Sequence, residues 1–152
     1  MTFEGDDPLD EVRALIDQVQ LESVEFHEVS ARRFNSGSDG EDGEISIEVQ
    51  IREGPGGFGV RLIATAEVAI GEAVVSVAGE YSMTEGADPS SRTIKQFVNE
   101  VAVMTVLPYL REGMTTITAK VFGKALYIPI IPRGDIAVEL DDEDAVRGDA
   151  QV

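Results

Sequence analysis

The chain has 152 residues, of which 43% are apolar and 27% are charged. This is the composition of a single globular domain and not of a disordered chain. It has no cysteine and one histidine, which excludes disulfides, thiolate catalysis and a metal site with several His ligands in one chain. The net charge of −17 repels phosphate backbones and anionic lipids, so we expect no nucleic-acid binding. No apolar run is long enough to span a bilayer, so we expect no membrane insertion.

The first 19 residues are predicted to be an acidic segment that ends in a short helix. Asp7 suits a helix N-cap and Pro8 suits the first helical position. Apolar residues recur at helical spacing from Leu9 to Val19, which predicts a helix over about residues 8–18. An acidic start is unlike a secretory signal, which needs a basic start and an apolar run, so we expect a cytoplasmic protein.

Four stretches of alternating apolar and polar residues then predict four strands, at about 20–34, 44–52, 58–68 and 75–83. The alternation slips near His27 and Glu28, which indicates a β-bulge. Turn-forming residues fill 35–43 and 54–57. Because such short connections favour antiparallel neighbours, the predicted fold class is α+β with a four-stranded antiparallel sheet.

A long C-terminal helix is predicted to pack on this sheet. After a break at 86–90, in which Ser90 suits an N-cap, the apolar period changes from two to 3.6. Apolar residues from Phe97 to Val121 step by three or four, which predicts a helix of about thirty residues. Pro108 lies inside it, so we expect a kink there.

The middle of this helix is apolar on more than one face. A helix that covers one sheet needs a single apolar stripe, so we expect the second face to pack against another copy of the chain. The residues expected at this oligomer interface are Val103, Val106, Leu107, Tyr109 and Leu110.

No motif in the chain predicts catalysis. His27 has no Ser or Asp pattern around it that would form a triad, and the glycine-rich stretch 54–59 lies between strands, where no helix N-terminus follows to hold a phosphate. The acidic residues of 39–44 lack the spacing of a calcium loop. We therefore expect neither an enzyme nor a cofactor or metal site.

The helix carries a recognisable pattern, made by Leu107, Pro108, Tyr109, Arg111, Glu112 and Gly123 and followed by the apolar, proline-containing segment 126–132. This pattern resembles the long helix and the following crossing segment of SecB-type export chaperones. The resemblance covers about residues 20–132, so we expect a SecB-like domain at 20–133. Residues 134–152 are expected to be an acidic flexible tail in the place where classical members have a second long helix.

The resemblance implies a function and a set of residues. It implies an ATP-independent chaperone, or holdase, that binds unfolded preproteins in apolar grooves for the Sec translocase and assembles as a dimer of dimers. The implied client-binding residues are Phe26, Phe34, Phe58, Tyr81, Met83, Leu126, Tyr127 and Ile128. The family docks the motor SecA through acids on the first and fourth strands; Glu28 occupies one such position, whereas Arg32 and Val77 occupy others, which leaves SecA binding open.

Two alternatives remain. The helix at 8–18 resembles an addition found in divergent SecB-like chaperones of toxin–antitoxin systems, so an antitoxin is an alternative client. A structural or adaptor protein that reuses this fold is the third interpretation, because a fold does not determine a function.

Overall fold

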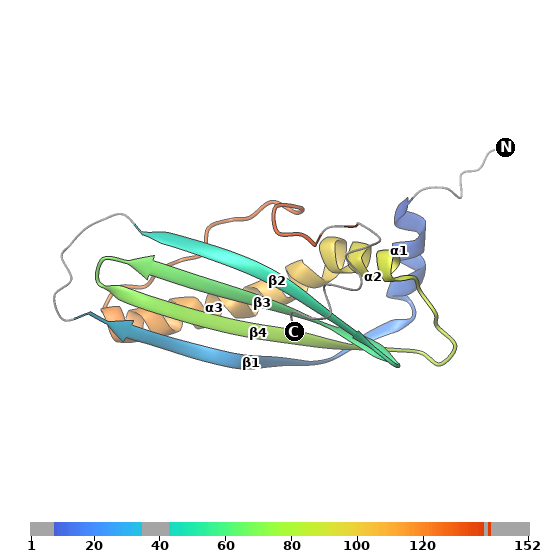
Figure 1. Ribbon diagram of the computed structural model, residues 1–152, viewed down its shortest axis with the longest axis horizontal. Helices are drawn as coiled ribbons and strands as arrows, with labels where there is room; N and C mark the ends of the chain where they lie inside the picture. The colour runs from blue at the N-terminus through green and yellow to red at the C-terminus, as the bar shows by residue number, and fades with distance from the viewer. Residues whose placement is uncertain (1–7, 35–42, 139, 141–152) are drawn as a thin grey trace.

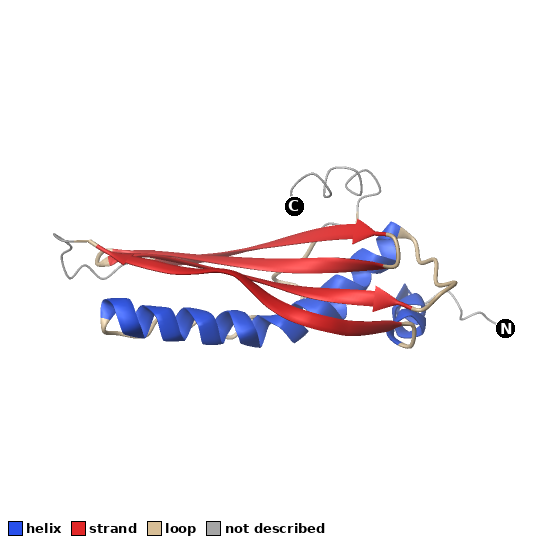
Figure 2. Ribbon diagram, turned by 90° about the horizontal axis from the view of Figure 1, so that it is seen from below, coloured by secondary structure: helices blue, strands red, loops and turns tan. Residues whose placement is uncertain are grey.

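The structure is a computed structural model, and it describes residues 8–34, 43–138 and 140. Its elements are α1 (Pro8–Ile16), β1 (Val19–Arg33), β2 (Glu44–Gly54), β3 (Gly57–Val68), β4 (Gly71–Met83), α2 (Ser91–Phe97), η2 (Val98–Ala102) and α3 (Val103–Phe122). The strands form one layer and α3 runs lengthwise under it, with α1 and α2 at one end (Figures 1 and 2). The predicted α+β fold is confirmed.

The four strands form one antiparallel sheet in the order β1-β4-β3-β2. Strands β2, β3 and β4 follow one another through short turns, and β1 pairs with β4 on the far side. This order leaves β1 and β2 as the two edges. The predicted loop at 35–42 lies outside the described residues.

Strand β1 contains two irregularities in its pairing with β4. One lies between Phe26 and Glu28, where the sequence predicts a bulge, and the other lies between Leu21 and Ser23, where it does not. Each bulge lets one residue go unpaired and resets which side chains face the helix. As a result Leu21, Phe26 and Val29 all pair with β4 residues whose side chains point to the helix-facing side.

In the other strands, apolar and polar residues alternate between a buried face and a solvent-exposed face of the sheet, as predicted. Leu62 and Ala64 of β3 and Val75 and Val77 of β4 are fully buried beneath the helix. On β2 the side chains of the opposite face, such as Glu48 and Arg52, are exposed. Helix α1 joins the same core through Val12 and Leu15, and Thr93 Oγ1 of α2 donates a hydrogen bond to Glu11 Oε1 at 2.7 Å.

The long helix runs from Ser91 to Phe122 through three segments. Ser90 is the N-cap and its hydroxyl accepts from the N–H of Thr93 at 3.1 Å, as predicted. Gly123 ends the helix with a left-handed φ of 75°, a conformation that glycine adopts without a steric penalty.

The long helix departs from α-helical hydrogen bonding in η2, before Pro108. Helix α3 keeps its α-helical geometry through Pro108, whereas η2 is a π-helix in which the N–H of Val103 bonds to the carbonyl of Val98. Pro108 has no N–H to donate to the carbonyl of Met104, four residues earlier, so α3 lacks this one hydrogen bond. Figure 2 shows a bend in the long helix, in agreement with the expected kinked helix, whereas η2 was not expected from the sequence.

Glycines on both layers let α3 lie close to the sheet. A Cβ on Gly79 of β4 would lie 2.9 Å from Cγ2 of Val106. A Cβ on Gly113 of α3 would lie 2.9 Å from Cγ1 of Val75 and 3.1 Å from Cε1 of Phe26. Each layer thus offers a glycine to a bulky side chain of the other.

This contact predicts the effect of a larger residue at Gly79. Gly79→Val is expected to lower the free energy of unfolding by about 1–3 kcal/mol, because the added methyl groups overlap Val106. Urea unfolding followed by circular dichroism measures the change. The double variant Gly79→Val with Val106→Ala should recover part of the loss, since it removes the overlapping methyl groups; strictly additive losses would contradict the contact.

Candidate binding surface

Residues 124–138 form an extended segment, here called the strap, that lies along one flank of α3 (Figure 1). It contains no helix and no strand, as its prolines predict. Three side chains of the long helix hold its main chain. The N–H of Leu126 donates to Thr118 Oγ1 at 2.8 Å, and Asn99 exchanges two hydrogen bonds with the main chain of Val138 at 2.9 and 2.7 Å.

The third of these side chains, Arg111, holds the middle of the strap. Its Nε donates to the carbonyl of Ile128 at 3.3 Å and its Nη2 donates to the carbonyl of Pro129 at 3.0 Å. All of these hydrogen bonds reach the main chain of the strap, so they place it without depending on which side chains it carries.

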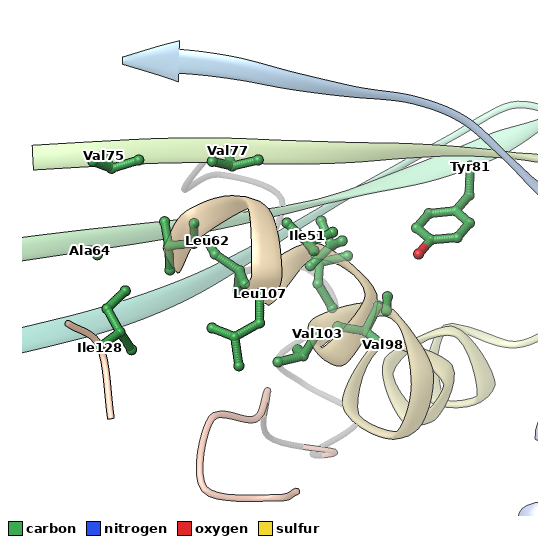
Figure 3. Close-up of a cluster of buried hydrophobic side chains, with 14 of the residues drawn as sticks. Ile51, Leu62, Ala64, Val75, Val77, Tyr81, Val98, Val103, Leu107 and Ile128 are labelled. Atoms are coloured by element: carbon green, nitrogen blue, oxygen red, sulfur yellow. The ribbon is translucent and has the colours of Figure 1, made fainter. Parts of the chain in front are cut away.

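The inner side of the strap completes the core. Ile128 is buried, and Leu126, Ile131, Ile136 and Val138 pack against the same cluster. Figure 3 shows Ile128 with Leu62, Leu107 and Val103, under the strands. The strap therefore covers a flank of α3 that the sheet does not reach.

This finding corrects the argument for the oligomer interface. Val103, Val106, Leu107 and Leu110 are all buried within a single chain. Burial of these four side chains therefore needs no second copy, because the sheet and the strap cover them within one chain. Tyr109, in contrast, is 44% exposed and remains available for contact with another chain.

Three of the predicted client-binding residues belong to the core. Phe58 and Tyr81 stack with ring centroids 5.2 Å apart, and Phe97 meets both rings edge-on at 5.6 and 5.4 Å. Ile128 is buried under the sheet. These side chains stabilise the fold and present no surface to a client in this structure.

The remaining predicted client-binding residues are accessible to different degrees. Phe26 is 44% exposed, Phe34 is exposed beyond the end of β1, and Tyr127 on the strap is 72% exposed. Met83 and Leu126 are partly buried. Sequence reasoning missed Ile130, which is 91% exposed, although it stands among the strap's apolar residues between two prolines.

Apart from Tyr109, Phe34 and the α1 residues Leu9 and Ile16, the exposed large apolar side chains of the described residues occupy two places. On the strap, Tyr127 and Ile130 face solvent on either side of the peptide groups held by Arg111. On β1, Leu21, Phe26 and Val29 lie along the free edge of the sheet, next to α3.

The acidic docking residue predicted from the sequence lies on the opposite face of the sheet. Glu28 is exposed there and accepts a hydrogen bond from Ser30 Oγ at 2.9 Å. Arg32, at a second docking position, pairs with Glu72 at 2.9 Å, whereas Val77, at a third, is buried in the core. Of these three positions, only Glu28 offers an exposed acid.

His27 lies on the same outer face and has no catalytic arrangement around it. Its Nδ1 lies 3.3 Å from Nη2 of Arg61, which is a cationic neighbour and not a nucleophile. Within the described ranges 8–34, 43–138 and 140, no group of three or more His, Asp or Glu side chains is placed to hold a metal ion. None of the described helices is long and apolar enough to cross a membrane.

Burial raises the pKa of the Tyr81 phenol above its usual value of 10.0, and the Thr105 hydroxyl opposes this shift in part. The folded chain therefore keeps this proton to a higher pH than the unfolded chain does. The corresponding contribution to stability is present below the unfolded pKa and is lost as pH rises through the folded pKa.

Comparison with known proteins confirms the resemblance to SecB-like chaperones. The chain is 26% identical over 133 residues to the SecB-like chaperone SmegB of Mycolicibacterium smegmatis, which covers 88% of this chain and 89% of that relative. No protein-family model matches the chain.

The fold is also that of a solved SecB-like chaperone. The structure of Rv1957 from Mycobacterium tuberculosis, in complex with a ChAD peptide from the Rv1956 HigA1 antitoxin, superposes with a TM-score of 0.69. The match covers 83% of this chain and 96% of that chain at 16% identity. The predicted SecB-like architecture is thus confirmed.

The Tyr81 environment predicts an alkaline effect on stability. As pH rises from about 9 to about 11, the free energy of unfolding is expected to fall less for Tyr81→Phe than for the unsubstituted chain. The reason is that the variant has no buried phenol to ionise. Denaturant unfolding at stepped pH measures this difference. Tyr127→Phe, which removes an exposed phenol, should follow the unsubstituted chain, and equal behaviour of both variants would contradict the assignment.

Proposed function

We propose that this protein is an ATP-independent chaperone that binds unfolded polypeptide segments and keeps them from aggregating. The observation that carries the proposal is the exposed apolar surface on the strap and on the β1 edge, in a chain of SecB-like fold that is similar to a SecB-like chaperone over most of its length. An unfolded client exposes apolar side chains of its own, and contact between the two surfaces removes both from water.

The charge of the chain supports this activity. A net charge of −17 keeps a protein with exposed apolar surface soluble, because copies repel one another at long range. The same charge attracts clients that are rich in Lys and Arg and speeds their encounter with the chaperone. Apolar contact and charge attraction together favour cationic, non-native chains over folded proteins.

Two client classes fit this surface. Exported preproteins are the clients implied by the resemblance to SecB, and in that case Glu28 is the exposed acid available for contact with SecA. An antitoxin is the alternative, favoured by the antitoxin peptide bound to the structurally similar Mycobacterium tuberculosis chaperone. Both kinds of client are made in the cytoplasm, where we place this protein.

We also propose that the chain assembles with itself, as a dimer of dimers, through the exposed side of α3. Tyr109 is the large apolar side chain that this side of the helix leaves in solvent, next to the exposed Pro108. In a monomer the Tyr109 ring stays exposed to water, whereas a subunit contact over Tyr109 would bury it.

The chaperone proposal predicts that the protein suppresses aggregation of a chemically unfolded, cationic client at near-stoichiometric ratios without any nucleotide. Light scattering during dilution of the client from denaturant measures this effect. A soluble protein of similar negative charge without exposed apolar side chains is the matched control and should not suppress scattering. No suppression of any of several unfolded clients would refute the function.

The client class is tested by competition for binding. An antitoxin segment and an unfolded preprotein are offered together, and the amount of each that is bound is measured. A strong preference for the antitoxin segment supports the alternative, whereas equal competition supports a general holdase.

The assembly proposal predicts opposite outcomes for two Asp substitutions on α3. Tyr109→Asp is expected to lower the native mass while leaving the chain folded, because a buried unpaired charge in a subunit contact costs several kcal/mol. Val106→Asp is expected to unfold the chain, because Val106 is buried within it. Native mass spectrometry and circular dichroism measure these outcomes, with Tyr109→Phe as the control that keeps the ring; an unchanged mass for Tyr109→Asp would remove Tyr109 from the contact.

A further inference from the structure

Among the described residues, one charged side chain is buried. Lys95 of α2 is 3% exposed, and its Nζ is shielded from solvent without a hydrogen-bond partner among those residues. Glu53 of β2 binds one turn earlier on the helix, where it accepts from Ser91 Oγ at 2.7 Å. An ammonium that has lost its water and has gained no partner destabilises the state in which it is buried.

The end of the C-terminal segment is held to the helix face that carries Lys95. Asn99, four residues after Lys95, exchanges two hydrogen bonds with the main chain of Val138. Arg92, three residues before Lys95, donates to the carbonyl of Leu140 at 2.8 Å. We call these two contacts the latch. Because residues three and four apart share one face of a helix, the latch has one contact on each side of Lys95, and its closure covers this turn.

The side chains at the latch are less deeply buried than those in the middle of the strap. Ile136, Val138 and Leu140 are half-buried, whereas Ile128 is 4% exposed. A segment with few buried apolar contacts opens at a lower free energy than the rest of a folded chain. The latch is therefore the part of the C-terminal segment that we expect to open first.

A turn separates the latch from the part of the strap that Arg111 holds. The N–H of Asp135 donates to the carbonyl of Pro132 at 3.1 Å. Gly134 in this turn has a φ of 99°, which lies in the left-handed region that favours glycine. The latch can therefore open beyond this turn while the rest of the strap stays bound to α3.

We propose that the latch is a conformational switch that opens and closes over α2 in the folded protein, and that the buried ammonium of Lys95 sets the balance between the two states. In the closed state Lys95 is buried without a partner, and in the open state water solvates it. The hydrogen bonds of Asn99 and Arg92 favour the closed state, so Lys95 opposes them. This inference concerns contacts within one chain and does not rest on the proposed chaperone function.

The first experiment measures amide hydrogen exchange at Val138 by NMR, because this N–H donates to Asn99 Oδ1 when the latch is closed. Lys95→Met keeps a long side chain and removes the charge. It is expected to slow this exchange at least about tenfold, because the closed state then buries no charge. The N–H of Leu126, which donates to Thr118 Oγ1 at the other end of the strap, is the internal reference and should keep its rate.

The matched control for this variant is Lys120→Met. It removes an exposed lysine of α3, so it changes the net charge by the same amount without changing the latch. The exchange rates at Val138 and Leu126 should both stay the same in this variant.

The second experiment follows Lys95 itself with an amine-reactive acetylating reagent and mass spectrometry. In the folded, unsubstituted protein, Lys95 is expected to react measurably but more slowly than the exposed Lys120, because it is reached only when the latch is open. Asn99→Ala should speed the reaction at Lys95 about threefold or more, since two hydrogen bonds of the latch are lost. Arg111→Met, which frees another part of the strap, should change it by less than about twofold.

Four results would overturn the inference. Unchanged exchange at Val138 in Lys95→Met would mean that the buried charge does not set the balance. Faster exchange in that variant would mean that the ammonium holds the latch closed by pairing with an acid of the chain outside the described residues. Equal slowing at Val138 and Leu126 would show a general gain in stability instead of local closure. Reaction of Lys95 as fast as that of Lys120 would show that Lys95 is not buried.

Discussion

The burial of α3 between the sheet and the strap is the packing arrangement on which the other features of the molecule depend. On the sheet side, Gly79 and Gly113 let the two layers approach closely enough for Val106 and Val75 to be buried. On the other side, the strap buries Ile128 and is held by hydrogen bonds from Asn99, Arg111 and Thr118 to its main chain. Both apolar faces of the helix are thereby buried within one chain.

This arrangement also explains where apolar surface remains exposed. The inner side of each covering element packs on the core. Exposed apolar residues lie where no further layer covers them, on the outer side of the strap, at the β1 edge, on the outer side of α3 and on α1. These places sit on elements that are themselves held in position, which reduces the ordering cost when another chain binds. The net charge of −17 counteracts self-aggregation through the same surfaces.

The candidate site was predictable in part, for reasons that differ between residues. Alternation along β3 and β4 correctly assigns Phe58 and Tyr81 to the helix-facing side, but it cannot show that Phe97 closes over both rings. Tyr127 and Ile128 are neighbours in one apolar run, but Tyr127 is exposed and Ile128 is buried. The sequence does not distinguish them, because the difference depends on their contacts in the folded chain. Arg111 belongs to the family-like pattern in the sequence. Its hydrogen bonds, however, reach the strap, which begins only after α3 has ended, so the sequence does not show them.

The local elements, the two faces of the sheet and the resemblance to SecB-like chaperones could all be predicted from the amino-acid sequence. Periodicity, capping residues and turn residues act over a few positions, so they can be recognised without knowing what lies across the core. The sequence could not show that the second apolar face of α3 is covered by the chain's own strap, or that a π-helical segment, η2, precedes α3. The physical reason is that burial depends on which distant residues meet: Leu126 and Val138 reach Thr118 and Asn99 only after the chain has turned back at Gly123.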